Sequence, residues 1–478
     1  MDGTAEKNSG IRRGFWNFID SIKGDKVVWI IVFMLIMISI LAVFSSTSLL
    51  AMSDQLDRLK IVREQIITAG MGIGLIWILC RIKKIRIFRV ISQLGFITSV
   101  FLLMILVTHA DLGFCRAIKT NEVYRAISFF GLQIHVFEFV KVAMVMYLAW
   151  AIHTYKKDQK AICSGEDSTS FAIINRLAKK ENFSFLAKPF WKRIFYIYVP
   201  ILTICVLIIP GSASSAIFIG GIMVATVMIG GIPMKEVFLA AATCIVGLLI
   251  VIGIHLASDG KMFGRVKTFM NRLEATYSPA ILEEVDENGR FVVKEGSTEF
   301  RERLDDIQQP FGAKVAVHEG GLLGKGSGNS TQKYVVAVMY GDYMFSFIIE
   351  EYGIWGAFLV IALYVSLLAR GSMIARLCDN EFAKVAVGGL SLLITGQAFM
   401  HMFVNVDIGP MTGQTLPLVS HGSSAFLMFS IAFGIILSIS RMTREKIKEE
   451  EEAATPIYER KEDEIQATLE DLERLENL

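Results

Sequence analysis

Residues 27–44 read VVWIIVFMLIMISILAVF, an apolar stretch long enough to cross a lipid bilayer as one helix. The run continues to about residue 52 and follows a mixed-charge segment, so it is too long for the hydrophobic region of a signal peptide. We therefore interpret 27–52 as a membrane span. The whole chain fits this interpretation, because it is 53% hydrophobic and only 20% charged, whereas soluble domains carry about 25% charge.

Similar runs recur along the chain, and they predict an all-α polytopic membrane protein with ten transmembrane helices. Lys and Arg gather in alternate connections, which places both termini in the cytoplasm and the long polar loop 258–342, between helices seven and eight, outside. The ten predicted helices lie near 27–52, 66–80, 88–108, 137–155, 194–210, 213–230, 236–257, 343–369, 383–405 and 419–440.

Composition also sets the domain boundaries and excludes some functions. We expect a cytoplasmic segment 1–26, a transmembrane domain 27–441 and an acidic cytoplasmic tail 442–478. A net charge of +2 argues against nucleic-acid binding. The six cysteines have no paired spacing, so neither a zinc site nor a disulfide framework is indicated.

A glycine-rich cluster, GGLLGKGSGNSTQK at 320–333, lies in the long loop. Glycines let a backbone approach a ligand closely and turn its amides toward an anion. The cluster lacks the GxxxxGK[ST] spacing of a nucleotide-binding loop. It is either a cradle for an extracytoplasmic phosphate or sugar, or a flexible outer loop.

Two further polar clusters flank the last membrane helices. Asp342 precedes helix eight and is either a helix cap or a catalytic group. Inside that helix, Glu350 and Glu351 fit structural ion pairing better than direct chemistry. The third cluster comprises Asn405 and residues 412–424, an irregular polar stretch that can line a cavity at membrane depth.

Together these clusters resemble the SEDS family, which includes FtsW, RodA and SpoVE, over residues 25–441. The family's GG-x-x-G-x-G-x-G loop matches 320–328, its DFIF-x-x-x-x-EE-x-G motif matches 342–353, and its TG-x-x-LP-x-x-S-x-GGS signature matches 412–423. Ser423 stands where the second glycine is usual. The opening at 24–29 and the TGQTLP stretch are most similar to FtsW.

The resemblance implies a peptidoglycan glycosyltransferase that polymerises lipid II outside the plasma membrane, with Asp342 as its catalytic residue. Asp342 would act as general base or metal ligand. The resemblance also implies a divalent cation (Mg²⁺ or Mn²⁺) without an organic cofactor, a class B penicillin-binding protein and other divisome proteins as partners, and a place at the division septum. Candidate substrate-binding residues are Arg265, Arg272, Gly320, Gly321, Gly324, Lys325, Gly326, Gly328, Lys333, Ser420 and Ser423.

A second group of residues is expected to shape the substrate path or the structure: Arg125, Glu138, Lys141, Glu350, Glu351, Asn405 and Pro417. Glu138 and Lys141 are spaced i,i+3, which allows an ion pair on one helix face. Ala126 follows Arg125 where the family usually has Trp, which changes the expected grip on substrate. Alternatives to the polymerase are a lipid II translocase, a RodA-like elongation polymerase and an inactive scaffold.

Overall fold

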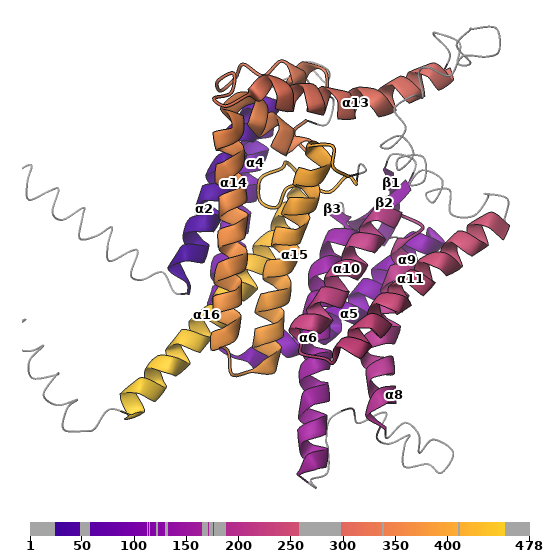
Figure 1. The fold of residues 1–478 in the computed structure, drawn as a ribbon, viewed down its shortest axis with the longest axis vertical. Coiled ribbons are helices and arrows are strands. Elements are labelled where there is room, and N and C mark those ends of the chain that lie inside the picture. The colour runs from indigo at the N-terminus through magenta and orange to yellow at the C-terminus, as the bar shows by residue number, and fades with distance from the viewer. Residues whose placement is uncertain are drawn as a thin grey trace, which may run out of the picture.

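The chain forms a bundle of long helices capped at one end by loops, a small sheet and a crossing helix (Figure 1). The computed structural model describes residues 24–47, 58–111, 113, 115–120, 123–129, 132–164, 171, 175, 188–257, 298–336, 339–409 and 412–454. Of these, eight helices are long and apolar enough to cross a membrane. The fold class predicted from the sequence, a polytopic α-helical membrane protein, is confirmed.

Each of the ten predicted spans overlaps a helix within the described residues. The helices of the first half are α2 (Lys26–Ser46), α4 (Arg58–Cys80), α5 (Ile85–Thr108), α6 (Val136–Cys163), α8 (Pro189–Arg193), α9 (Val199–Ile208), α10 (Ala213–Ile229) and α11 (Met234–Ala257). Between α8 and α9 a π-helical turn, Ile194–Tyr198, keeps the rod continuous. Pro200 lies just beyond this turn and lacks an amide hydrogen, which explains the local widening.

The second half contains α13 (Thr298–Gly320), a 3₁₀ turn (Gln332–Tyr334), α14 (Met344–Leu377), α15 (Glu381–Asn405) and α16 (Ser423–Ala454). Gly353 has φ 67° and ψ −165°, so α14 is interrupted there. The expected helix 343–369 is therefore two pieces, and Glu350 and Glu351 lie in the short first piece. Residues 354–377 rise about 36 Å, enough to span a bilayer.

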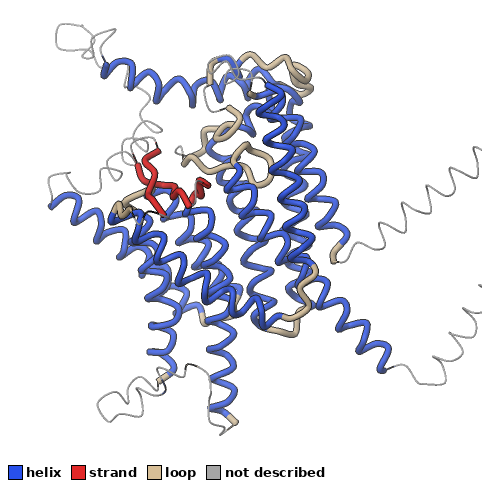
Figure 2. Tube along the Cα trace, turned by 180° about the vertical axis from the view of Figure 1, so that it is seen from behind, coloured by secondary structure: helices blue, strands red, loops and turns tan. Residues whose placement is uncertain are grey.

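A three-stranded antiparallel meander precedes α6, in the connection between the predicted helices 88–108 and 137–155. It consists of β1 (Cys115–Thr120), β2 (Val123–Phe129) and β3 (Leu132–His135), in the order β1-β2-β3. The sheet and the loops gather at the same end of the bundle (Figure 2). We call this end the loop face: the sheet, α13, residues 321–336 and 339–343, and residues 406–409 and 412–422.

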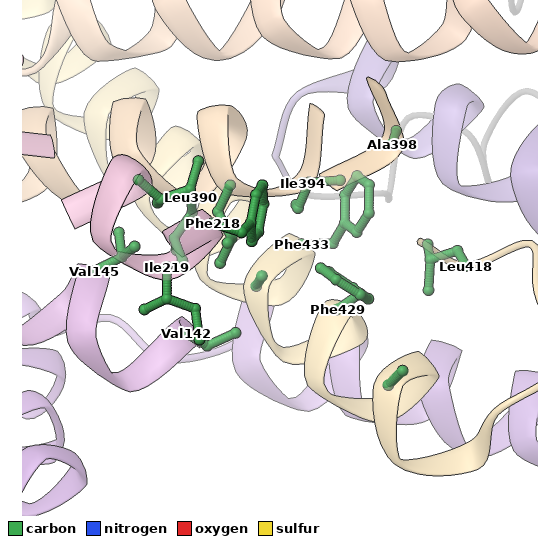
Figure 3. Close-up of a cluster of buried hydrophobic side chains, with 14 of the residues drawn as sticks. Val142, Val145, Phe218, Ile219, Leu390, Ile394, Ala398, Leu418, Phe429 and Phe433 are labelled. Atoms are coloured by element: carbon green, nitrogen blue, oxygen red, sulfur yellow. The ribbon is translucent and has the colours of Figure 1, made fainter. Parts of the chain in front are cut away.

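Buried apolar side chains from four helices join the two halves of the bundle (Figure 3). Val142 of α6 and Ile219 of α10 lie beside Leu390 of α15, and Phe429 and Phe433 of α16 complete this part of the core. The core thus ties α15 to both halves, and α15 ends at the loop face.

Candidate functional site on the loop face

Asp342, half-buried, lies on the loop face directly before α14. The side-chain amide of Asn405, the last residue of α15, donates a hydrogen bond of 2.9 Å to the carbonyl oxygen of Asp342. A Cβ atom added to Gly413 would lie 3.7 Å from Oδ2 of Asp342, so the carboxylate lies against the 412–416 segment. The structure therefore brings Asp342, Asn405 and the third polar cluster together.

The first turn of α14 is fixed by two side chains of α15. Asn405 Oδ1 accepts from the Ser346 amide at 2.9 Å, and His401 Nε2 accepts from the Phe345 amide at 3.3 Å. His401 Nδ1 bonds the Gln414 carbonyl at 2.7 Å. All these groups are buried. Because these amides lie just after Asp342, the two α15 side chains set the position of its backbone.

On its other side, the segment before Asp342 is bonded to residues 416–421. The Ser420 hydroxyl donates to the Gly341 carbonyl at 2.7 Å and accepts from the Leu416 amide at 3.0 Å. The His421 amide donates to the Tyr340 carbonyl at 3.0 Å. Ser420, which we predicted to bind substrate, therefore links the backbone of Gly341 to that of Leu416.

Two other predicted residues of this cluster are Pro417, in its middle, and Ser423, near its end. The Pro417 carbonyl accepts from the buried Tyr364 hydroxyl at 2.6 Å, which attaches the cluster to α14. Ser423 is the first residue of α16. Both residues are therefore placed to shape the segment that faces Asp342.

Lys141 is a buried cation that joins three parts of the bundle. Its Nζ lies 2.6 Å from Glu138 Oε1, which confirms the predicted i,i+3 ion pair. It also donates to Gln397 of α15 and, at 3.0 Å, to Gln414 Oε1. The Gln414 amide in turn donates to Ser215 of α10. This buried charge is therefore paired and hydrogen-bonded, as its burial requires.

Arg125 and Ala126 lie on β2, at the edge of this site. Arg125 Nε donates to the Gly211 carbonyl at 3.4 Å, which links the sheet to the start of α10. Ala126 is fully buried and pairs across the sheet with Ile118 and His135. Ala126, which stands where the family usually has Trp, is therefore a buried residue of the central strand.

The glycine-rich loop encloses two carboxylates of the chain itself. Glu350 Oε1 accepts from the Thr331 amide at 2.7 Å and the Gln332 amide at 3.2 Å. Glu351 Oε1 accepts from the Gly328 amide at 2.9 Å. The predicted cradle does form, but the groups that its amides bind are the side-chain carboxyl groups of Glu350 and Glu351.

The predicted loop glycines 320, 321, 324, 326 and 328 serve this packing. Gly321, Gly324, Gly326 and Gly328 have positive φ angles between 52° and 91°, which side chains rarely adopt. A Cβ on Gly320 would lie 2.2 Å from the Ile349 carbonyl oxygen. Gly320 and Gly324 therefore allow the loop to approach the 349–353 backbone closely, whereas glycine at 321, 326 and 328 suits the positive φ angles.

The two lysines predicted to face a phosphate both bond within the chain. Lys325 pairs with Glu319 and, at 3.1 Å, with Glu350. Burial alone would lower the pKa of Lys325, but its bonds to both carboxylates raise it above the ordinary value. Lys333 is buried and donates to the Gly328 carbonyl at 2.7 Å. Both lysines stabilise the loop around its internal carboxylates.

Other polar groups at the site were not predicted. Gln397, His401 and Gln65 are buried within helices, and Gln65 bonds His421 at 2.8 Å. A polar residue inside an apolar span is the sequence signal that could have found them. The predicted Arg265 and Arg272 lie outside the described residues. Among the described residues, no group of three or more His, Cys, Asp or Glu side chains is arranged to hold a metal ion.

This fold and this site define a class: a polytopic helical membrane protein with a polar site built at one end of its bundle. The family model described as "Cell cycle protein" (FTSW_RODA_SPOVE) matches residues 25–445. The chain belongs to this FtsW/RodA/SpoVE family, which confirms the resemblance inferred from the motifs.

Individual relatives match shorter stretches. The chain is 37% identical over 149 residues to "Peptidoglycan glycosyltransferase MrdB" of Escherichia coli (strain K12), covering 28% of this chain and 39% of that protein. It is 32% identical over 154 residues to "Probable peptidoglycan glycosyltransferase FtsW" of Bacillus subtilis (strain 168), covering 30% of this chain and 38% of that protein. The matched stretches thus span well under half of either relative.

Two solved structures share the fold over most of the chain. A chain from a study of the "Structural coordination of polymerization and crosslinking by a peptidoglycan synthase complex" has a TM-score of 0.55 at 17% identity, covering 88% of this chain and 98% of that chain. RodA of Thermus thermophilus has a TM-score of 0.50 at 16% identity, with the same coverage. At these identities the likeness establishes the fold.

Proposed function

We propose that this chain is a peptidoglycan glycosyltransferase that polymerises lipid II at the outer face of the bacterial plasma membrane. The observation that carries the proposal is the placement of Asp342, half-buried against residues 412–416 with its backbone fixed by Asn405. The names of the relatives, which include both FtsW and MrdB peptidoglycan glycosyltransferases, support the same reaction class.

In the proposed reaction, the 4-hydroxyl of an acceptor sugar attacks the anomeric carbon of a donor. A carbon–oxygen bond forms there as the bond to the lipid pyrophosphate breaks, and the pyrophosphate leaves with the bonding electrons. The Asp342 carboxylate would accept the hydroxyl proton as general base. Its half-buried position keeps the carboxylate accessible to a sugar while excluding much of the water.

Three buried oxygen atoms near this site support a polar substrate. Thr412 Oγ1, Thr415 Oγ1 and Glu138 Oε2 have no hydrogen-bond partner among the described residues. A buried polar atom without a partner is costly, so such atoms commonly serve a ligand or an ordered water. An ordered water or a substrate hydroxyl would satisfy such an atom.

A divalent cation fits the site only if Asp342 and the substrate bind it together. Asp342 supplies one carboxylate, and magnesium is commonly held by one or two carboxylates together with substrate phosphates. Asp342 and the substrate would thus hold Mg²⁺ or Mn²⁺ together, and the ion would supply positive charge to the leaving pyrophosphate. This role is compatible with Asp342 acting as base through its other oxygen.

We further propose that the loop face is extracytoplasmic, that both termini are cytoplasmic, and that the protein works with a class B penicillin-binding protein at the division septum. The Lys and Arg distribution supports the orientation. Asp25, the N-cap of α2, lies 2.8 Å from Arg444 of α16, and α2 begins at the end of the bundle opposite α13 (Figure 1). The synthase complex among the structural relatives supports the choice of partner, and isolation of an elongation transpeptidase instead would contradict the septal role.

The test compares Asp342→Asn with wild type, each purified together with the cognate transpeptidase and supplied with lipid II. We expect loss of glycan polymerisation in Asp342→Asn and normal polymerisation in Asp407→Asn, which removes a loop-face carboxylate paired with Lys314 at 2.6 Å. Undiminished polymerisation by Asp342→Asn would reject the proposed role of Asp342. Lipid II translocation by the wild type without polymerisation would favour a translocase.

A further inference from the structure

Two leucines at the tip of the glycine-rich loop are unusually exposed for their type. Leu323 is 81% exposed and Leu322 is 67% exposed. A lone exposed leucine on a soluble surface needs no explanation. Two adjacent ones at a loop tip, in a chain that spans a membrane, raise the question of what covers them.

The tip is held rigidly against the start of the membrane-spanning part of α14. The Ile354 amide donates to the Gly321 carbonyl at 3.0 Å, and the Gly324 amide donates to the Gly320 carbonyl at 2.8 Å. A Cβ on Gly353 would lie 2.4 Å from the Leu322 carbonyl oxygen, so the two backbones are in close contact. The leucines are therefore presented by a fixed backbone at the level of residues 353–354.

The surface next to the tip is the apolar outer surface of α14. Ile354, Trp355 and Phe358 are all exposed, and Trp355 is 66% exposed, at the first turn after the break. Exposed apolar side chains on a membrane-spanning helix face lipid, and Trp is enriched at the membrane–water boundary. The leucine tip thus adjoins an apolar surface of a helix that is long and apolar enough to cross a membrane.

Charged groups lie behind the tip. Glu319, partly exposed, pairs with Lys325 at the end of α13, where α13 meets the upper end of α14 (Figure 1). The loop therefore combines an ion pair at its base with two exposed leucines at its tip. This arrangement is typical of segments that lie in the interfacial layer of a bilayer.

We propose that Leu322 and Leu323 insert into the lipid leaflet on the loop face and anchor the glycine-rich loop at the membrane boundary. The occupant of the tip is lipid, and the inference holds whatever reaction the site performs. The anchor sets the height of the loop over the bilayer, and with it the height of the 344–352 helix that the loop encloses.

The test measures depth in vesicles of purified full-length protein. A nitroxide is attached to Leu323→Cys, to Ser327→Cys on the same loop, or to Phe358→Cys on the lipid-facing surface, each in a variant without native cysteines. At positions 323 and 358 we expect collisions with oxygen to exceed those with a water-soluble nickel chelate, and at 327 we expect the reverse order. Dominance of the chelate at 323 would overturn the proposal, as would low accessibility to both reagents, which indicates a protein contact.

A second measurement does not depend on removal of the cysteines. In Leu323→Trp, made in the native chain, brominated lipids should quench the added fluorescence more than the same lipids quench that of Ser327→Trp. Equal quenching of the two variants would overturn the proposal. Tryptophan emission at 323 that aqueous acrylamide quenches as strongly as at 327 would overturn it as well.

Discussion

Asn405 joins the end of α15 to the backbone of the candidate catalytic residue. Its amide donates to the Asp342 and His401 carbonyls, and its oxygen accepts from Ser346. Asn405→Ala removes these buried hydrogen bonds, so we expect about 2 kcal/mol lower stability. Because Asp342 would then be less well placed, polymerisation should fall roughly tenfold to a hundredfold. Thermal unfolding and a lipid II polymerisation assay measure the two effects.

Asn380, at the opposite end of α15, provides the matched control. Its side chain caps the helix by accepting from the Phe382 amide at 3.0 Å. Asn380→Ala should cost about 1 kcal/mol of stability and leave polymerisation unchanged. Equal loss of polymerisation in both variants would show that Asn405 acts through general stability alone.

Glu319 gives the glycine-rich loop a dependence on pH. Its hydrogen bond from Lys325 lowers the pKa of Glu319 below the ordinary 4.5, against the opposing effect of burial. A carboxyl group whose pKa falls on folding adds stability above its ordinary pKa, and that stability is lost as the pH falls through the lowered value. We expect amide protection in 321–333, measured by hydrogen exchange, to weaken below about pH 4.5.

Glu319→Gln provides the comparison, because glutamine does not titrate. Its loop should be less protected at pH 7 and should change less between pH 7 and pH 3.5. The other acidic groups that the loop encloses, Glu350 and Glu351, are common to both proteins, so the comparison isolates Glu319. An identical pH profile in both proteins would rule out Glu319 as the titrating group.

At the residue scale, sequence patterns located the site better than they assigned its contacts. The i,i+3 spacing of Glu138 and Lys141 fixed their ion pair, because helix geometry alone brings them together. The bonds that Lys325 and Lys333 make within the loop could not be predicted from sequence spacing. Their partners depend on a loop conformation set by Gly353, which lies far along the chain.

At the element scale, Gly353 allows α14 to break and the glycine-rich loop to close on it. An alanine there would need φ 67° and would place its Cβ 2.4 Å from the Leu322 oxygen and 2.6 Å from the Gly324 nitrogen. We expect Gly353→Ala to lower stability by about 3 kcal/mol, from backbone strain and overpacking together. Thermal unfolding of the purified protein measures it.

Gly321→Ala separates the two contributions. Gly321 also has a positive φ, 52°, but an added Cβ would meet no atom within 4 Å. Only strain remains, so the loss should be about 1 kcal/mol. A Gly353→Ala variant no less stable than Gly321→Ala would contradict the close backbone contact.

Hydropathy predicted where the helices lie, but it did not predict where several of them begin and end. The predicted helix 66–80 begins at Arg58, and the predicted 419–440 helix runs from Ser423 to Ala454. Charged turns such as those after Arg441 continue a helix beyond the apolar stretch that hydropathy detects. The sheet at 115–135 was missed because its strands are short and carry charged residues among the apolar ones.

At the scale of the whole molecule, Asp25 ties the first described helix, α2, to α14 and to the last described helix, α16. It is 1% exposed, caps α2, and pairs with Arg370 of α14 and Arg444 of α16, both at 2.8 Å. Asp25→Asn keeps a capping oxygen but leaves both cations without their counter-charge. We expect about 2 kcal/mol lower stability, seen as a lower thermal midpoint.

Asp379→Asn is the control for Asp25. Asp379 is 72% exposed and pairs with Lys446 at the same end of the molecule. Its loss should change stability by less than about 0.5 kcal/mol. High salt should leave the Asp25 effect largely intact, since that pair is partly shielded from water. A drop of equal size in both variants would count against the Asp25 pairing.

The glycine-rich loop binds carboxylates that are part of the same chain, so its ordering is complete once the protein has folded. A substrate that reaches Asp342 finds this loop already set, and binding need not supply the conformational entropy that closing a flexible segment would cost. We therefore expect the loop to behave as a fixed part of the loop face and not as a lid. Turnover should consequently depend little on motions of residues 320–333, and cross-linking this loop to α14 should leave the rate largely intact.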